Sequence, residues 1–177
     1  MSLVGQKAPE WTAVAHVNGE QKTLCGADFA GRWYVLYWYP MDFTFVCPTE
    51  IKGFQKLLGD FEDEKVSVIG ASTDSFYTHK AWFADRETFP QEITHPIVAD
   101  TNHSLCRAFG VLKEDQGVAF RATAVVDSEG VVRAVSVNDL SVGRNVDEVV
   151  RVLDGLQSDE LCPCNWTKGE DTLGKAA

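Results

Sequence analysis

Long apolar runs along the chain predict the strands of a buried sheet. The run RWYVLYWYP ends at Pro40 and is short enough to be a central strand covered on both faces. KVSVIGAST, residues 65–73, predicts a second buried strand, and HPIVAD, residues 95–100, predicts a short third one. RATAVVD and VVRAVSV stand on either side of SEG, which predicts two antiparallel strands joined by a tight turn.

Helical spacing marks the segments between these runs. One helix is predicted after Cys47, where the recurring apolar residues are Ile51, Phe54, Leu57, Leu58 and Phe61. A second helix is predicted over about 74–86, and HSLCRAFG predicts a short helix closed by Gly110. Asn145 and Glu148 resemble a capping box, and a long amphipathic helix follows, with apolar positions at Val146, Val149, Val150, Leu153 and Leu156.

The order of these elements predicts the fold class. Strand, helix, strand, helix and strand, followed by a hairpin and a helix, describe an α/β protein with a mixed central sheet flanked by helices. A thioredoxin-like arrangement fits this order. Because the chain becomes polar and cysteine-containing after Gln157, we expect one domain over 1–157 and a C-terminal tail over 158–177.

Charge and length exclude several classes of protein. A chain of 177 residues can form one domain with a substantial core. Its formal charge of -10 argues against an electrostatic footprint for nucleic acid. No apolar run approaches the ~18 residues of a membrane span. The start of the chain also lacks a cationic segment followed by an apolar one, so we expect neither a membrane anchor nor a secretory signal.

The cysteines point to redox chemistry in a reducing compartment. Five is an odd number, and the spacing is not that of a dense disulfide framework, so a cytoplasmic protein with chemically used thiols is expected. We expect no metal and no cofactor. The C-x-C at 162–164 has no second ligand pair at metal spacing, and the 4 histidines are scattered.

Cys47 lies where a helix is predicted to follow a buried strand, at the carboxyl end of the sheet. Two helix registers are open. Cys47 is the N-cap with Pro48 in the first helical position, or Thr44 is the N-cap and accepts a hydrogen bond from the Cys47 backbone N–H. We prefer the second register because it uses the Thr44 hydroxyl. Both place the sulfur at the positive end of the helix dipole.

A reactive Cys47 needs more than this dipole. A free cysteine is only a few per cent thiolate at neutral pH. A helix terminus contributes about 0.3–1 kcal/mol, so a nearby cation is required. Arg121, at the mouth of an apolar strand, is the candidate, and Glu50 is placed to accept from it and orient it. The alternative is that Cys47 is a buried, inert thiol and Arg121 a surface arginine.

Several segments resemble one enzyme family. PMDFTFVC, Pro40 to Cys47, is similar to the Pro-x-x-x-Thr-x-x-Cys signature of peroxiredoxins. THKAW, RATAVVD, GRNVDEVVRVL and CPCNWTKGE follow in the family's order, so the resemblance covers almost the whole chain. The nearest resemblance is to typical two-cysteine peroxiredoxins of the bacterial alkyl hydroperoxide reductase C type.

This resemblance implies a thiol-dependent peroxidase that reduces hydrogen peroxide and organic hydroperoxides. It implies that Cys47 is the peroxidatic cysteine, whose thiolate attacks the O–O bond and becomes a sulfenic acid. Thr44 and Arg121 would hold the peroxide, Pro40 would shield the sulfur from water, and Glu50 would position Arg121.

Further roles also follow from the resemblance alone. Arg144 corresponds to a second family arginine near the site. Cys162 resembles the resolving cysteine, which forms a disulfide with Cys47 of the partner subunit. A thioredoxin-like or flavoprotein disulfide reductase then restores both thiols. The family assembles as homodimers and as decamers built from five dimers.

Two other functions stay open beside the peroxidase. A thioredoxin-like disulfide oxidoreductase is disfavoured because Cys47 lacks a C-x-x-C partner. A ring-forming redox chaperone is not exclusive of peroxidase activity.

The chain departs from the family pattern in two places. Cys164 stands where the family usually has a residue other than cysteine. It is either a neutral replacement or an auxiliary thiol that substitutes for Cys162 or takes over its disulfide by thiol exchange. The chain also lacks a Gly-Gly-Leu-Gly segment and a terminal Tyr-Phe helix, which the family associates with sensitivity to overoxidation, so we predict a peroxide-robust enzyme. Cys25 and Cys106 match no catalytic position.

Overall fold

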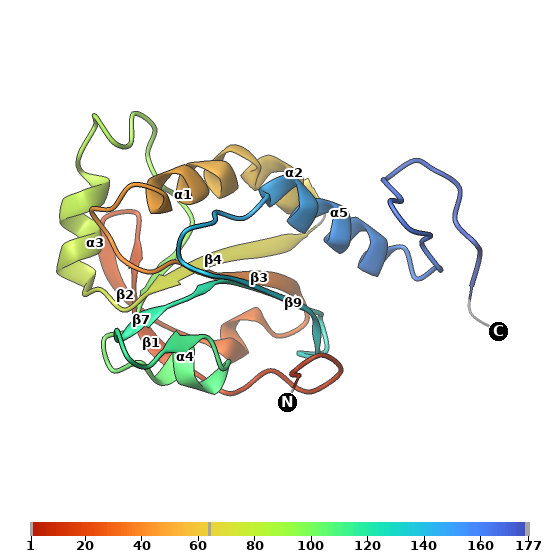
Figure 1. The fold of residues 1–177 in the computed structure, drawn as a ribbon, viewed down its shortest axis with the longest axis horizontal. Coiled ribbons are helices and arrows are strands. Elements are labelled where there is room, and N and C mark those ends of the chain that lie inside the picture. Colours follow the sequence, from red (N-terminus) through yellow and green to blue (C-terminus); the bar gives the residue numbers. More distant parts are fainter. Residues whose placement is uncertain (1, 64, 176–177) are drawn as a thin grey trace. The chain divides into compact units, whose positions relative to one another are not determined.

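A mixed sheet forms the centre of the larger of two compact units. The computed structural model describes residues 2–63 and 65–175. Its two units are Met1–Arg144 and Asn145–Ala177. In the part of the chain that the structure describes, seven strands form one sheet in the order β2-β1-β5-β4-β3-β8-β9 (Figure 1). The strands of this sheet are β1 Thr12–Val17, β2 Glu20–Cys25, β3 Trp33–Trp38, β4 Val66–Ser72, β5 Ile97–Ala99, β8 Arg121–Val126 and β9 Val132–Asn138.

The two parallel strand pairs lie at the centre of the sheet, and antiparallel pairs flank them on both sides, including β1 with β2 and β1 with β5. β3 pairs parallel with β4, and β4 with β5, whereas β8 joins β3 antiparallel and continues into the β8–β9 hairpin. A separate small ribbon is formed by β6 Leu112–Lys113 and β7 Val118–Ala119. The helical segments are η1 Gly26–Phe29, α1 Cys47–Lys56, α2 Leu58–Asp63, α3 Phe76–Phe83, α4 Ser104–Ala108 and α5 Val146–Gln157. The predicted α/β architecture with a mixed central sheet is therefore confirmed.

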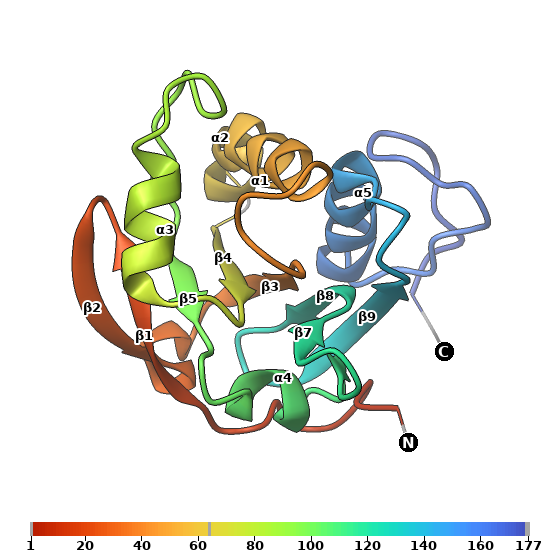
Figure 2. The same cartoon turned by 60° about the vertical axis from the view of Figure 1, so that its left-hand side comes forward.

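Side-chain alternation along β3 separates two layers of core. Leu36 and Trp38 point into one apolar cluster, which also contains Leu105 of α4. Tyr37 points to the other face, where its ring stacks on Phe54 of α1 with ring centroids 4.0 Å apart. In Figure 1, α1 and α2 lie on one side of the sheet and α4 on the other, and in Figure 2 α3 runs beside β1 and β5. Helices on both faces bury the central strands, which explains their unbroken apolar sequences.

Two features of the larger unit differ from the prediction. The predicted helix after Cys47 is two helices, because the chain leaves helical geometry at Leu57, where φ is -98° and ψ is 10°. The β1–β2 hairpin was not predicted. Its signal was Asn18-Gly19, since φ values of 51° and 80° at these residues are those of a two-residue hairpin turn.

The second unit contains α5 and the tail. Asn145 caps α5 by accepting a hydrogen bond from the Glu148 backbone N–H at 3.2 Å, so the predicted N-cap is confirmed. Val149 and Leu153 supply the buried positions of α5. The chain's contacts group α5 with the tail, whereas the prediction placed α5 in a domain ending at 157; that domain boundary stays a prediction. Within residues 2–63 and 65–175, no helix has both the length and the apolar character needed to cross a bilayer.

Candidate active site

The start of α1 places Cys47 at a helix terminus, but in neither predicted register. The N-cap is Val46, with Cys47 and Pro48 as the first two helical residues, so the assignments of Cys47 or Thr44 as N-cap were wrong. Thr44 instead donates from its hydroxyl to the Met41 carbonyl at 2.8 Å, closing a turn within the preceding loop. The sulfur still lies at the positive end of α1, as both registers predicted.

Arg121 and Glu50 meet at the sulfur. Cys47 is fully buried, with 0% of its surface exposed. The Nη1 of Arg121 donates to the Cys47 Sγ at 3.3 Å and to the Glu50 Oε2 at 2.6 Å. Its Nε donates to the Leu140 carbonyl at 2.7 Å, which fixes the plane of the guanidinium. β8 supplies the arginine and the first turn of α1 supplies the other two side chains.

Arg144 is fixed more firmly than the sequence indicated. Its backbone N–H and its Nε both donate to the Glu50 Oε1, at 3.0 and 2.9 Å. Its Nη1 donates to the Ala122 carbonyl at 2.7 Å, and its Nη2 donates to the Trp38 carbonyl. The guanidinium also lies over the Tyr37 ring, 5.3 Å from the centroid. Glu50 therefore binds both arginines and connects α1 to β8 and to the end of β3.

The charges of this cluster favour an anion at the sulfur. The ion pairs of Glu50 that the described residues form are with Arg121 and Arg144, and all three side chains are at least 95% buried. Two guanidinium groups and one carboxylate leave one positive charge, which a Cys47 thiolate neutralises. Burial opposes the charge on Arg121, but Cys47 and Glu50 outweigh it and raise the pKa of the guanidinium. The cluster thus has the cation that the helix dipole alone lacked.

The loop before Cys47 presents apolar side chains to solvent. Pro40 is buried at its start, while the side chains of Met41, Phe43 and Phe45 are exposed. Phe43 has a φ of 56°, a left-handed backbone that is costly for a bulky residue. Pro40 and Thr44 therefore lie on a strained loop that leads directly into the cysteine.

Two buried histidine contacts were not predicted from the sequence. His79 of α3 contacts Asp42, and His95 accepts or donates at the Tyr37 hydroxyl, 2.8 Å from its Nε2. Burial lowers the pKa of His95 to about 3, so it is neutral at physiological pH. Burial raises the pKa of Asp42, and His79 partly opposes that change. Asp42 and His79 belong to the segments YPMD and THKAW, and hydrophobic periodicity gives no reason to expect contact between these two segments.

The tail keeps its two cysteines as free thiols. Cys162 is half-buried, with its Sγ 3.5 Å from the Ser158 Oγ, and Cys164 is exposed. The hydrogen bonds that Arg151 donates to the Glu148 carboxylate are the main cause that raises the pKa of Arg151, and the two sulfurs add to it. Both thiols therefore share a cationic neighbour. The residues described contain no group of three or more histidine, cysteine or acidic side chains able to hold a metal ion.

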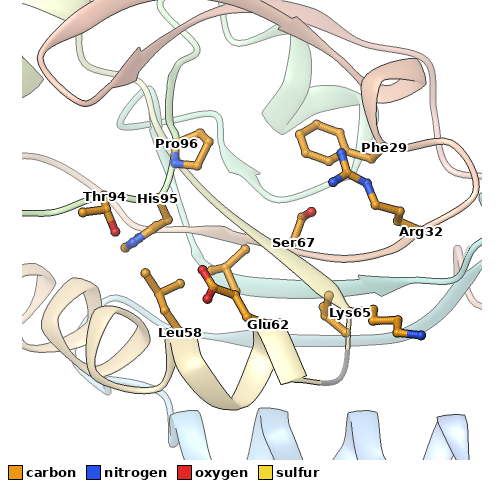
Figure 3. Close-up of a pocket in the computed structure, with 11 residues that line it drawn as sticks. Phe29, Arg32, Leu58, Glu62, Lys65, Ser67, Thr94, His95 and Pro96 are labelled. Carbon is orange, nitrogen blue, oxygen red and sulfur yellow. The ribbon is translucent and has the colours of Figure 1, made fainter.

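A cavity of about 460 Å³ lies at the other end of the parallel strands (Figure 3). Val66 and Ser67, the first residues of β4, line it, together with His95. Cys47 instead follows the carboxyl end of β3. The described residues that line the cavity include neither Arg121 nor Arg144. This cavity is therefore separate from the reactive cluster.

The chain is similar to known proteins over nearly its full length. Residues 4–135 match the AhpC/TSA family. The chain is 43% identical to the thioredoxin peroxidase of Echinococcus granulosus, with 99% of this chain and 94% of that protein covered. It is 45% identical to the alkyl hydroperoxide reductase C of Mycolicibacterium smegmatis, with 96% and 92% covered. The reduced 2-Cys peroxiredoxin of Plasmodium vivax superposes with a TM-score of 0.93 at 36% identity, covering 97% of this chain and 93% of that one.

The fold and the buried cysteine cluster define a thiol-based redox protein of the thioredoxin-like class, and the structural likeness confirms that predicted class. The chain belongs to the AhpC/TSA family and is a peroxiredoxin, the class of thiol-dependent peroxidases.

Proposed function

We propose that Cys47 is the peroxidatic cysteine and reduces hydrogen peroxide and organic hydroperoxides. The thiolate attacks the terminal oxygen of the peroxide, an S–O bond forms as the O–O bond breaks, and water or an alcohol leaves after protonation. The cysteine becomes a sulfenic acid. One observation carries the proposal: the Arg121 guanidinium donates to the buried Cys47 sulfur at 3.3 Å. A fixed donor at this point stabilises both the attacking thiolate and the charge that develops on the leaving oxygen.

The neighbouring residues have supporting roles in this proposal. Glu50 holds Arg121 in place, since it accepts from the Nη1 that also contacts the sulfur. Arg144 in turn fixes the Glu50 carboxylate through two hydrogen bonds. Thr44 presents its hydroxyl to the bound peroxide when the turn to Met41 loosens, and Pro40 excludes water from the sulfur.

Resolution requires a change of structure at α1. A sulfur with 0% exposure cannot reach a second chain, so the first turn of α1 has to open before a disulfide forms. We propose that Cys162 of the partner subunit then attacks the Cys47 sulfenic acid, which releases water and leaves an intersubunit disulfide. A thioredoxin-like or flavoprotein disulfide reductase returns two electrons and two protons. Cys162 suits this role because it is half-buried but not in a disulfide.

Cys164 acts in this proposal as an auxiliary thiol: it attacks the Cys47 sulfenic acid where Cys162 is absent, releasing water, and otherwise exchanges with the disulfide of Cys162. It is exposed and lies two residues beyond Cys162, and both sulfurs lie near the Arg151 charge. Its thiolate attacks the Cys162 sulfur of the intersubunit disulfide, forms a Cys162–Cys164 bond and releases Cys47 as a thiolate. No additional oxidant is needed, because the exchange moves a disulfide that already exists.

Self-association accounts for the exposed apolar loop. Met41, Phe43, Phe45 and Tyr77 are 45%, 60%, 95% and 75% exposed. Met41, Phe43 and Phe45 are close in sequence, whereas Tyr77 lies on α3. Exposed apolar side chains of this kind favour an interface, and we propose that a second copy of this chain covers them within a homodimer-based decamer. Sedimentation velocity of Phe45→Ser and Tyr77→Ser should show smaller assemblies than the wild type. An unchanged sedimentation coefficient in both variants would remove this surface from the proposal.

We place the enzyme in a reducing, cytoplasm-like compartment. The support is that all five cysteines, each of which the structure describes, are free thiols. The acidic charge makes nucleic acid and anionic membranes unsuitable partners.

A stoichiometric peroxide titration followed by nonreducing electrophoresis tests the main proposal. The Cys164→Ser protein, in which the exchange step cannot remove the intersubunit bond, should consume one equivalent of peroxide per chain and convert to a disulfide-linked dimer, and Cys47→Ser should do neither. Cys25→Ser is the matched control, since Cys25 has no role in the proposed chemistry. Peroxide consumption by Cys47→Ser at the wild-type rate would refute the assignment.

A further inference from the structure

A buried polar cluster lies beside the Cys47 loop and takes no part in the chemistry proposed above. Asp42, in the loop, and His79, in α3, face each other with the His79 Nδ1 2.7 Å from the Asp42 Oδ2. Neither side chain has any exposed surface. The Tyr39 hydroxyl donates to the other carboxylate oxygen, Oδ1, at 2.8 Å. A charged or polar pair so deeply buried persists only while its members satisfy each other.

The contacts of His79 define its protons. Its Nε2 lies 3.3 Å from the Val98 carbonyl oxygen, which can only accept, so Nε2 carries a hydrogen. The short contact to Asp42 needs a second proton between nitrogen and oxygen. The pair therefore holds two protons and uses both ring nitrogens. Displacing Asp42 would leave a buried ring nitrogen and a buried carboxylate without partners, which is costly.

The backbone of the loop is held at the same residue. The Asp42 N–H donates to the Asp74 Oδ2 at 2.9 Å, and the Ser72 hydroxyl at the end of β4 donates to the same oxygen at 2.7 Å. Asp42 is thus bound to α3 through its side chain and to the segment after β4 through its backbone. The next residue, Phe43, has the left-handed φ of 56° and an exposed side chain. Beyond Asp42 the Phe43 ring still contacts Trp82 of α3, with centroids 5.7 Å apart, but Asp42 is the last residue of the loop that buried side-chain hydrogen bonds hold.

We propose that Asp42 and His79 are positioning residues that anchor the amino-terminal end of the peroxidatic loop. Opening then begins after Asp42, so Pro40 keeps its place while Thr44 and Cys47 move out and return. The inference rests on the proposed role of Cys47. An anchor at this point favours the closed loop, in which the peroxide reacts, over the open loop, in which the disulfide forms.

A pair of substitutions at one position separates the two contacts of His79. The amide nitrogen of asparagine occupies the place of Nδ1, so His79→Asn keeps a donor toward Asp42. The amide of glutamine occupies the place of Nε2, so His79→Gln keeps only the contact to Val98. We expect His79→Gln to lower the second-order rate constant of Cys47 with hydrogen peroxide at least tenfold. Disulfide formation from the sulfenic acid should become faster in the same variant, and His79→Asn should recover most of both changes.

Hydrogen exchange provides a readout that does not depend on peroxidase activity. In the reduced full-length protein, peptides covering 39–50 should exchange faster in His79→Gln than in His79→Asn, while peptides of β8 exchange at the wild-type rate. His103→Gln, which replaces a half-buried histidine outside this cluster, is the control and should match wild type.

The outcomes distinguish this inference from the function on which it rests. Equal losses in His79→Asn and His79→Gln would overturn the anchor, since they would report side-chain packing rather than the Asp42 contact. Unchanged exchange and rates in His79→Gln would overturn it as well. If wild-type Cys47 fails to react with peroxide, the proposed function fails, and the exchange comparison still decides whether Asp42 and His79 hold the loop.

Discussion

Replacing Arg121 with glutamine tests the physical basis of the active site. The change removes the donor 3.3 Å from the Cys47 sulfur and one of the two cations bound to Glu50. Glu50 keeps Arg144, whose Nε lies 2.9 Å from its Oε1, so the carboxylate is not left unpaired. The substitution therefore acts mainly on the sulfur and on the oxygen atoms that react with it.

The contacts of Arg121 set the expected size of the effect. A hydrogen bond to a charged group contributes about 1.5–3 kcal/mol net. Since about 1.4 kcal/mol corresponds to a factor of ten in rate, Arg121→Gln should lower the second-order rate constant with hydrogen peroxide by about 10- to 150-fold.

Stopped-flow tryptophan fluorescence measures the peroxide step. Arg133→Gln is the matched control: it removes an arginine that pairs with Asp127 at 2.5 Å in the same hairpin, outside the cysteine cluster. Urea unfolding of each variant separates loss of stability from loss of reactivity. A rate constant for Arg121→Gln within twofold of wild type, in a folded protein, would refute the reasoning.

Three further outcomes are expected. Cys162→Ser should retain partial peroxide turnover through Cys164, and mass mapping of nonreduced wild-type peptides should find a Cys162–Cys164 linkage. Complete loss of turnover in Cys162→Ser, together with Cys47–Cys162 as the sole linkage in wild type, would exclude the auxiliary role. During turnover at low micromolar peroxide, mass spectrometry should find no sulfinic Cys47, and its accumulation would contradict the predicted robustness. Burial lowers the pKa of His95 from 6.5 to about 3, so between these two pH values the unfolded chain protonates this histidine and the folded chain does not. Across that window the free energy of unfolding should fall by about 1.4 kcal/mol, through this group, for each unit by which the pH is lowered. His95→Gln should lose that share of the slope in urea titrations, and an identical slope would contradict it.

The strands were predictable because both faces of the sheet are covered. β3 and β4 are buried along almost their whole lengths, so their sequences are continuously apolar. β2 is largely exposed and has no such run, and only the Asn18-Gly19 turn marked it. The break at Leu57 was not predictable from spacing, because Leu57 and Leu58 continue the apolar pattern across it.

The contacts of the candidate site were predictable where chemistry and local position coincide. Cys47 and Glu50 share one helical turn, and Arg121 opens a buried strand, so a charge argument connected them before any contact was known. The Asp42–His79 contact joins residues 37 positions apart, and its partner Val98 uses a backbone carbonyl. Nothing in the residue types of those segments specifies that pairing, since it depends on how α3 packs against the sheet. The predicted helix register was wrong because the Thr44 hydroxyl donates to the Met41 carbonyl within the loop and does not cap α1.

The double hydrogen bond from Arg144 to Glu50 also ties the catalytic turn to the rest of the chain. Arg144 is the last residue of the first compact unit, and the chain passes from it directly to Asn145 and α5. The carboxylate that binds Arg121 is therefore also hydrogen-bonded to the residue from which the chain continues to α5 and Cys162. If α1 opens as proposed and Glu50 moves, both hydrogen bonds to Arg144 break, so we expect the opening at Cys47 to free the backbone from which the segment carrying Cys162 begins.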